Sequence, residues 1–307
     1  MAGLVESEAA TATLPHVRLS LGGDASAEVA LFGATVLSWR CGGAERLWVS
    51  SLSAMDGSAP IRGGVPIAFP QFADDGPLPL HGFARVSQWT LVDETNDDNT
   101  ATATFELLSP QAIAGWGGEC SLRYTVSLTR QSLHLELKVE NVGYTSFDFT
   151  ACLHTYLRVS DVRDFTLVGL EGLEYYDKVA NVDARDDVDL QVESAARASG
   201  NAAGAADLGF VDRIYKGAGA RSPLMLTDEA EAYDISQAGF RDTIVFNPWL
   251  EGKKGQRGPD FDDVGYKNML CVEPAETMRG SGPVTLSPEE NWTGSQTITI
   301  RQRKVYY

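Results

Sequence analysis

Short runs in which apolar and polar residues alternate recur along most of the chain, with turn residues between them. The clearest case spans residues 120–141. The apolar positions are Leu122, Tyr124, Val126 and Leu128 in the first run and Leu133, Leu135, Leu137 and Val139 in the second. Successive side chains of a strand point to opposite faces, so this alternation predicts a hairpin with one buried face and a turn at residues 129–132.

Similar runs begin near Val17 and continue to the final segment QTITIRQRKVYY, and helical periodicity is rare. The alanine-rich region 189–206 is predicted to be a short helix or a surface insertion. Short strands from end to end favour an all-β fold in which antiparallel sheets form a sandwich. No repeat or Pro/Ser linker divides the chain, so residues 16–307 are predicted to form one domain behind a flexible lead-in at 1–15.

Composition and charge narrow the range of partners. Hydrophobic residues make up 43% of the chain and charged residues 22%, which is typical of a soluble protein that buries a substantial core. A formal net charge of -17 disfavours nucleic acid and anionic membrane surfaces as partners. A small anion remains possible as a ligand, because a few converging arginines outweigh the global field at short range.

The four cysteines are widely spaced and form no CxxC motif, so neither a zinc site nor a redox pair is predicted. Most lie in apolar surroundings, where a small buried thiol is typical. We find no cleavable secretion signal and no apolar span of about 20 residues. These features predict a reduced, cytoplasmic protein.

Only four histidines are available for proton transfer near neutral pH. His16 and His134 lie in strand-like runs and are interpreted as structural or surface residues. His154, in TACLHTYLRVSD, is either a core histidine bonded to a carbonyl or, beside a carboxylate, a general acid. Glu273, after the apolar run NMLCV, is either a rim residue or a general base. Asp212, in GFVDRIYK, is by itself compatible with a simple turn.

The segment GGVPIAFPQFADDGPLPLHGFAR at 63–85 is rich in proline and glycine, and it carries His81 and Arg85. Such a segment forms a rigid irregular loop that presents side chains with little ordering cost on binding. Six blocks then follow one another in order: IRGGVPIAFPQF at 61–72, LPLHGFAR at 78–85, LHTYLRVSD at 153–161, VDRIY at 211–215, VFNPW at 245–249 and CVEPA at 271–275. With these blocks the chain resembles the glucose-6-phosphate 1-epimerases, hexose-6-phosphate mutarotases related to aldose 1-epimerase.

The resemblance implies a large antiparallel β-sandwich of the galactose-mutarotase type. It also implies interconversion of the α and β anomers of glucose 6-phosphate, with His154 as general acid and Glu273 as general base, on opposite sides of one pyranose. The implied substrate-binding residues are Arg62, Gln71, His81, Arg85 and Asp212, of which the two arginines bind the phosphate. Neither a cofactor nor a metal is implied, and the protein is expected to be a monomer, although the sequence leaves the oligomeric state open.

Three departures from the family pattern bear on substrate preference: the acids of ADDG at 73–76, Phe246 where tryptophan is expected, and the charged loop 251–263. A free-aldose 1-epimerase and a sugar lyase remain alternatives, although the two arginines favour a phosphate. A non-catalytic carbohydrate-binding sandwich could use the tryptophans at 39, 48, 89, 116, 249 and 292 for stacking. Glycoside hydrolysis is disfavoured, because the Asp-Asp pairs lie in polar loops.

Overall fold

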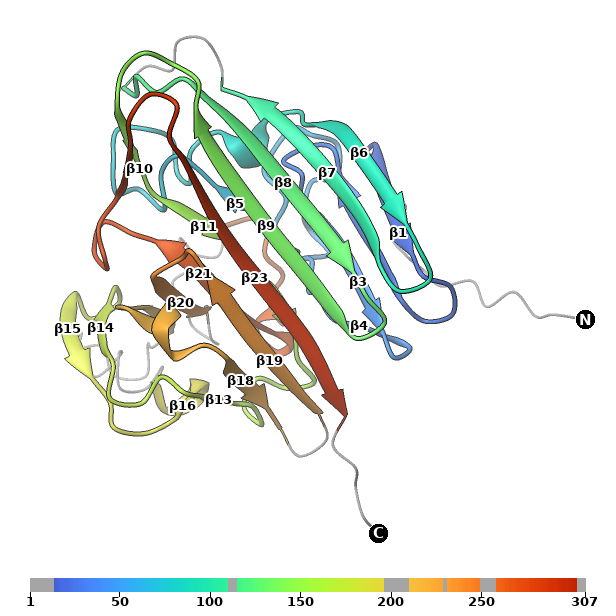
Figure 1. The fold of residues 1–307 in the computed structure, drawn as a ribbon. Helices are drawn as coiled ribbons and strands as arrows, with labels where there is room; N and C mark the ends of the chain where they lie inside the picture. The colour runs from blue at the N-terminus through green and yellow to red at the C-terminus, as the bar shows by residue number, and fades with distance from the viewer. Residues whose placement is uncertain (1–13, 110–114, 196–209, 229–230, 249–257, 303–307) are drawn as a thin grey trace, which may run out of the picture.

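The computed structural model describes residues 14–109, 115–195, 210–228, 231–248 and 258–302 (Figure 1). Strands dominate these residues, and the short 3-10 helices are η1 (Ala84–Val86), η2 (Ala218–Arg221) and η3 (Gly265–Asn268). The predicted all-β class is therefore confirmed. Within the alanine-rich region, residues 192–195 form one helical turn, and 196–206 lie outside the described residues. No helix in the described ranges is long and apolar enough to cross a membrane.

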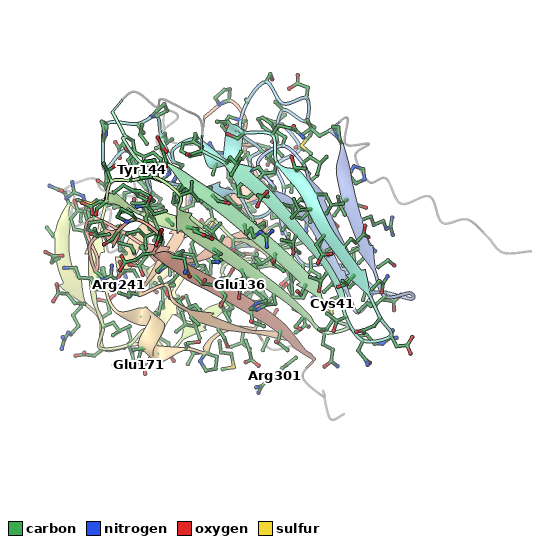
Figure 2. All side chains as sticks on the ribbon, turned by 45° about the horizontal axis from the view of Figure 1, so that its top comes forward. Cys41, Glu136, Tyr144, Glu171, Arg241 and Arg301 are labelled. Carbon is green, nitrogen blue, oxygen red and sulfur yellow. The ribbon has the colours of Figure 1, made fainter. Side chains whose placement is uncertain are left out.

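One antiparallel sheet has nine strands in the order β16-β13-β18-β19-β23-β9-β8-β7-β6. Their bounds are β6 (Thr90–Asn96), β7 (Ala101–Leu108), β8 (Cys120–Leu128), β9 (Ser132–Asn141), β13 (Thr166–Val168), β16 (Leu190–Gln191), β18 (Leu224–Thr227), β19 (Glu231–Ala238) and β23 (Asn291–Gln302). The predicted hairpin is confirmed as β8 and β9, in which Leu128 pairs with Leu133. Alternate side chains of β9 are buried, while others, such as Glu136, lie on the outer face (Figure 2).

A second sheet lies behind the first in the view of Figure 1 and follows the order β15-β14-β17-β20-β21-β11-β5, with β12 also paired to β21. Its strands are β5 (Ile67–Ala68), β11 (Ala151–Leu153), β12 (Tyr156–Arg158), β14 (Glu174–Asp177), β15 (Val182–Arg185), β17 (Val211–Tyr215), β20 (Asp242–Asn247) and β21 (Met269–Glu276). All eight residues of β21 are buried, so this central strand is covered on both faces.

Two smaller sheets complete the fold. The first runs β1-β2-β3-β4 and the second pairs β10 with β22. The strands are β1 (His16–Ser20), β2 (Ser26–Ala30), β3 (Val36–Cys41), β4 (Ala44–Glu45), β10 (Phe147–Phe149) and β22 (Val284–Leu286). The largest hydrophobic cluster joins residues of the nine-stranded sheet, such as Tyr124 and Leu135, to residues of the eight-stranded sheet, such as Val245 and Leu270. The main core therefore lies between the sheets, as a sandwich requires.

The five described tryptophans belong to this core or its edge. Trp39, Trp48 and Trp89 are buried, and Trp116 and Trp292 pack against the core while partly exposed. Trp249 lies outside the described residues. None of the five offers a fully exposed ring, which weakens the alternative of a stacking platform for sugars. All four cysteines are free and buried, whereas the sequence predicted burial for most of them.

Candidate active site

The register of the eight-stranded sheet brings distant residues onto one face. Asp212 of β17 pairs with Phe246 of β20, and Phe246 pairs with Cys271 of β21. Tyr156 of β12 pairs with Cys271 from the other side, and Glu273 follows Cys271 by two positions. Directly paired residues, and residues two apart on a strand, point to the same face of a sheet. One face of the sheet therefore carries Asp212, Glu273 and Tyr156 together.

His154 and Glu273 are in direct contact on this face. His154 Nδ1 lies 3.1 Å from Glu273 Oε1, and the side chains are 13% and 1% exposed. The imidazole stacks on the Tyr156 ring with centroids 4.6 Å apart, and its Nε2 lies 3.5 Å from the Tyr156 hydroxyl. The expectation that the two groups flank a pyranose from opposite sides is therefore wrong, because no ring fits into a 3.1 Å contact. A sugar must instead lie across both groups.

The carboxyl group of Glu273 has few polar partners for a buried acid. Its Oε2 accepts a hydrogen bond from Cys152 Sγ at 2.9 Å. The contact with His154 lacks hydrogen-bond geometry, and His154 Nδ1 is a buried nitrogen with no other hydrogen bond. Burial raises the pKa of Glu273 to about 8, although the thiol of Cys152 acts in the opposite direction. Glu273 is therefore largely protonated at neutral pH.

The pKa of His154 shifts in the opposite direction. Burial lowers its pKa well below the usual value, and the positive charges of Arg62, Arg85 and Lys178 lower it further. Both shifts favour the state in which the proton is on Glu273 and His154 is neutral. Moving that proton across the 3.1 Å contact would give the imidazolium and carboxylate that the family resemblance implies.

His81 reaches the same place from the irregular loop. Its backbone is left-handed, with φ of 63°, and Gly82 follows at φ 67°. A Cβ on Gly82 would lie 2.2 Å from the carbonyl oxygen of Phe69, so this tight turn requires glycine. His81 Nδ1 accepts a hydrogen bond from the Ala73 N–H, which places the ring proton on Nε2. The centroid of the His81 ring lies 5.5 Å from that of the His154 ring.

Gln71 is buried within the same loop. Its amide nitrogen donates to the carbonyls of Ala73 and Leu78, and its amide oxygen accepts from the Leu78 N–H. These bonds hold the loop that presents His81. Sugar contact by Gln71 stays a prediction, and bracing of the loop is the role that its own bonds indicate.

Arg62 approaches the site from a segment that packs tightly on the small sheet. A Cβ on Gly64 would lie 2.1 Å from the carbonyl oxygen of Val36, so the backbone comes as close as only glycine permits. The guanidinium is 3.4 Å from the Tyr156 hydroxyl, and its fork holds Asp260 through Nε at 3.0 Å and Nη2 at 3.3 Å. Asp260 belongs to the described end of the charged loop that the sequence marked as a departure.

Arg85 lies in η1 and is half-buried. It donates from Nη2 to the Leu80 carbonyl at 2.7 Å, whereas its buried Nε has no partner. Burial lowers the pKa of Arg85 to about 10, and the charge of Arg62 contributes to that shift. The unpaired Nε leaves Arg85 with a donor for an anion, whereas the fork of Arg62 already holds Asp260.

Sequence reasoning missed Lys178, which follows β14. Its Nζ lies 3.2 Å from Asp212 Oδ2, and the two side chains are 25% and 16% exposed. Burial raises the pKa of Asp212, and Lys178 acts in the opposite direction. The segment EYYDKV resembles any strand that ends in a solvated charge, so no local signal marks this lysine. The histidines that the sequence excluded lie elsewhere: His134 contacts Thr297, and His16 contacts Leu14.

One cluster among the described residues has the composition of a metal site. Ligand atoms of His154, Cys271 and Glu273 lie within 4.8 Å of one another. Metal binding needs a thiolate, yet burial raises the pKa of Cys271 well above its usual value. Glu273 is also occupied by the Cys152 thiol. The cluster of His154, Cys271 and Glu273 therefore does not fit a metal site.

The sequence pattern of aldose 1-epimerases matches residues 15–299. The chain belongs to the aldose 1-epimerase family. It is therefore an isomerase, and its fold is an antiparallel β-sandwich. The family resemblance that the six sequence blocks indicated is confirmed.

Two relatives of this epimerase carry the provisional name glucose-6-phosphate 1-epimerase. The protein from Cenchrus ciliaris is 33% identical over 281 residues, which cover 87% of this chain and 79% of the relative. The protein from Salmonella typhimurium is 30% identical over 285 residues, which cover 90% and 87%.

Solved structures confirm the galactose-mutarotase type of fold. A protein from Salmonella typhimurium, described provisionally as a mutarotase, superposes with a TM-score of 0.76 at 27% identity and covers 91% of this chain and 88% of its own. Galactose 1-epimerase from Lactobacillus acidophilus superposes with a TM-score of 0.69 at 14% identity and covers 94% of each chain. The second likeness shows the fold alone.

Proposed function

We propose that this epimerase interconverts the α and β anomers of glucose 6-phosphate. The observation that carries the proposal is the contact between His154 and Glu273, together with two arginines: Arg62, which reaches the Tyr156 hydroxyl beside His154, and Arg85, whose buried Nε has no partner. The first pair has the chemistry for proton transfer to and from a sugar, and the second suits a phosphate. The names of the relatives point to the same substrate.

The proposed reaction needs two proton transfers and no redox step. Glu273, as carboxylate, accepts the proton of the C1 hydroxyl while His154, as imidazolium, donates one to the ring oxygen. The C1–O5 bond then breaks, C1 becomes an aldehyde, and rotation about C1–C2 exposes its other face. Ring closure reverses both transfers and leaves the groups as they began. A positioned acid or base contributes about 10²- to 10⁴-fold to such a step.

The geometry of His154 indicates which nitrogen would act. Nδ1 faces Glu273 at 3.1 Å, whereas Nε2 makes only a long 3.5 Å contact with the Tyr156 hydroxyl. We assign donation to the ring oxygen to Nε2. His81, with its proton on Nε2, would donate to a second sugar oxygen, and Asp212 would accept from a hydroxyl.

Binding of the phosphate would prepare the pair for reaction. Arg62 and Arg85 are among the charges that lower the pKa of His154. A phosphate dianion between them would offset those charges and favour imidazolium. The proton would then move from Glu273 to His154, which leaves Glu273 as the required base. This step would populate the active protonation state more fully with a phosphorylated sugar than with a free one.

The remaining features of the proposal concern context. We propose that residues 16–307 act as one domain, as a monomer in the cytoplasm, on a small-molecule substrate and without nucleic acid. The charge of -17 supports the exclusion of nucleic acid, and the four free thiols support a reducing compartment.

The test is α/β exchange measured by magnetisation-transfer NMR on glucose 6-phosphate and on free glucose at matched concentrations. We expect the protein to accelerate exchange of both, with a higher kcat/KM on the phosphate. Acceleration of free glucose alone would identify a free-aldose 1-epimerase instead. No acceleration of either sugar would contradict the proposal and favour a binding protein.

A further inference from the structure

Lys178 lies beside Asp212 in the site, and it transfers no proton in the proposed reaction. Its backbone N–H donates to the Asp212 carbonyl at 2.9 Å, and its Nζ is 3.2 Å from Asp212 Oδ2. The same Nζ lies 5.5 Å from the centroid of the Phe72 ring, over the ring face. A lysine with a quarter of its side chain exposed is held between an acid and an aromatic ring instead of extending into water.

The turn that carries Lys178 is fixed by buried groups. Asp177 accepts hydrogen bonds from the N–H groups of Val179 and Ala180 at 3.0 and 2.9 Å. Arg213, which is 2% exposed, lies 3.3 Å from Asp177 through Nε. Lys178 is therefore presented by an anchored turn. A fixed cation costs less to use in binding than a flexible surface lysine does.

The ion pair with Asp212 leaves binding capacity on both partners. An ammonium group has three N–H donors, and a carboxylate has lone pairs on both oxygens. One described contact joins Nζ to Oδ2, so donors and acceptors remain side by side. A hydroxyl group both donates and accepts, and it can therefore bridge the two. Such a pair is suited to a sugar hydroxyl.

The order of groups across the site indicates which hydroxyl this is. Arg62 contacts the Tyr156 hydroxyl at 3.4 Å, Tyr156 contacts His154 Nε2 at 3.5 Å, and His154 Nδ1 contacts Glu273 at 3.1 Å. Beyond Glu273, β20 separates β21 from β17, which carries Asp212, the partner of Lys178, whereas β12 with Tyr156 pairs with the opposite edge of β21. The site therefore runs from the arginines through the acid–base pair to Lys178.

A hexopyranose 6-phosphate presents its groups in the same order: the phosphate on C6, the ring oxygen, the C1 hydroxyl and then the C2 hydroxyl. With the phosphate at the arginines, O5 at His154 and O1 at Glu273, the next group around the ring reaches Lys178. We propose that Lys178, paired with Asp212, binds the C2 hydroxyl and selects sugars that carry it. This inference rests on the proposed function and names a specificity residue for it.

The test compares glucose 6-phosphate with 2-deoxyglucose 6-phosphate, using kcat/KM for α/β exchange measured by NMR. Lys178→Met is expected to lower kcat/KM about 10- to 100-fold on glucose 6-phosphate and less than about threefold on the 2-deoxy sugar. Lys178→Arg, which keeps the charge, should fall between Met and wild type. Equal losses on both sugars would assign Lys178 to structure alone, and no loss on either would also overturn the proposal.

Lys216 supplies a matched control. It pairs with Glu174 and Asp183, which are 52% and 60% exposed, so it belongs to the solvent side of the neighbouring strands. Lys216→Met should leave both sugars unaffected.

If Lys178→Met does not fold, the kcat/KM values of the wild-type protein on the two sugars still test whether the C2 hydroxyl is bound. It should favour glucose 6-phosphate over the 2-deoxy sugar by about 10-fold or more, and equal kcat/KM values would contradict the proposal. Failure of the proposed function is a separate result, because wild type would then exchange neither phosphate.

Discussion

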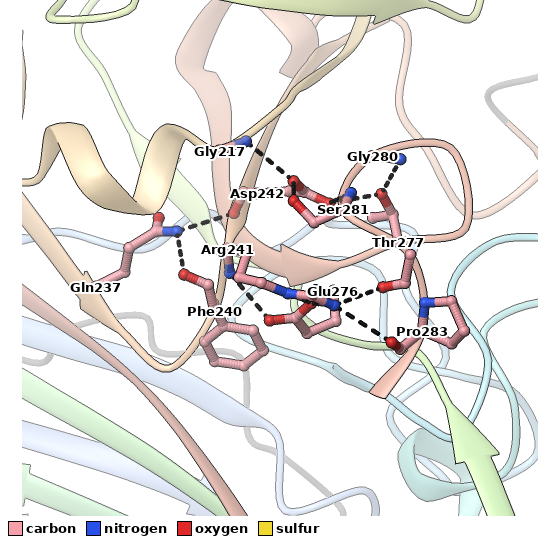
Figure 3. Close-up of polar contacts among 11 residues, drawn as sticks. Gly217, Gln237, Phe240, Arg241, Asp242, Glu276, Thr277, Gly280, Ser281 and Pro283 are labelled. Atoms are coloured by element: carbon pink, nitrogen blue, oxygen red, sulfur yellow. Dashed lines mark hydrogen bonds and ion pairs between the residues drawn. The ribbon is translucent and has the colours of Figure 1, made fainter. Parts of the chain in front are cut away.

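Strand β21 carries two buried glutamates, Glu273 and Glu276, which differ in the hydrogen-bond donors around their carboxyl groups. Glu276 accepts hydrogen bonds from the backbone N–H of Arg241 at 3.0 Å and from its Nε at 2.6 Å (Figure 3). Glu273 accepts one hydrogen bond, from the Cys152 thiol. Its contact with the His154 imidazole lacks hydrogen-bond geometry. Burial raises the pKa of both groups, but Arg241 opposes the rise at Glu276, whereas that of Glu273 reaches about 8.

The neighbourhood of Glu276 extends to Asp242, which is fully buried and accepts from Thr277, Gly217 and both donors of Ser281 (Figure 3). These bonds tie the chain that follows β21 to the sheet. Satisfied carboxylates thus hold structure, while the poorly satisfied one keeps a proton that can move. Burial is common to both regions, so the number and kind of donors separates the structural acid from the chemical one.

The largest expected effect separates the two glutamates by activity. Glu273→Gln should lower α/β exchange of glucose 6-phosphate about 10²- to 10⁴-fold, because an amide cannot accept the C1 proton. Glu276→Gln should leave exchange close to wild type in the folded protein. NMR exchange rates on both variants, with circular dichroism to verify folding, make the comparison. Comparable losses of exchange rate in the two variants would contradict the division into a chemical and a structural glutamate.

The next effect concerns the two arginine environments. Arg85→Ala should raise KM for glucose 6-phosphate about 10- to 100-fold, because charge-assisted hydrogen bonds to the phosphate are lost, and should spare turnover of free glucose. Arg241→Ala is the matched control, because that arginine serves Glu276, and its KM should not change. Steady-state kinetics on both sugars measure this. A phosphate role for Arg85 is excluded if its loss affects the two sugars equally.

The glutamates should also differ in how stability depends on pH. The pKa of Glu273 rises from 4.5 to about 8 on folding, so between these values the folded state binds a proton that the unfolded state does not. Stability from this group is therefore present below pH 4.5 and is lost as pH rises, by up to about 1.4 kcal/mol per pH unit.

Glu273→Gln should remove that slope. Compared with wild type at the same pH, the free energy of unfolding of the variant should therefore be higher at pH 8 than at pH 5. Glu276→Gln should instead lose about 1–3 kcal/mol of unfolding free energy, because donors of Arg241 lose a carboxylate partner. Urea denaturation across this pH range measures both. A pH slope that persists in Glu273→Gln would mean that another group causes it.

The smallest effect tests the thiol beside Glu273. The hydrogen bond from Cys152 lowers the pKa of Glu273, so Cys152→Ala should move the apparent pKa in the kcat/KM profile upward by less than about one unit. Cys152→Ser, which keeps a donor, should restore the profile. Cys41→Ala removes another buried thiol, whose partner is the Arg130 carbonyl, and serves as the control. An unchanged profile in Cys152→Ala would show that the thiol only fills space.

Local patterns were sufficient to predict much of the fold. Alternation at residues 122–139 predicted β8 and β9, because a hairpin pairs neighbouring segments and its register follows from one turn. The contact of His154 with Glu273 depends on the pairing of strands that lie more than a hundred residues apart. Alternation gives each strand two faces, but it does not say which strands meet.

Resemblance provided the candidate residues at the site, and the structure changed the interpretation of several. The bonds of Gln71 stay within its own loop, and the amide side chain alone gives no sign of that. Lys178 escaped notice because its partner, Asp212, lies on another strand. Cys152 was expected to be a small buried thiol, and its burial is confirmed. Its contact with Glu273 arises from strand pairing that no local pattern encodes.

In the proposed mechanism Glu273 and His154 share one proton, which substrate phosphate moves onto the imidazole. Nitrogen-15 NMR of histidine-labelled protein tests this directly, because the chain has only four histidines and His154→Ala assigns the signal required. At pH 7 we expect a neutral His154 in the free protein and an imidazolium with saturating glucose 6-phosphate. A His154 that stays neutral with bound sugar phosphate, or that is already charged without it, would overturn the shared-proton mechanism.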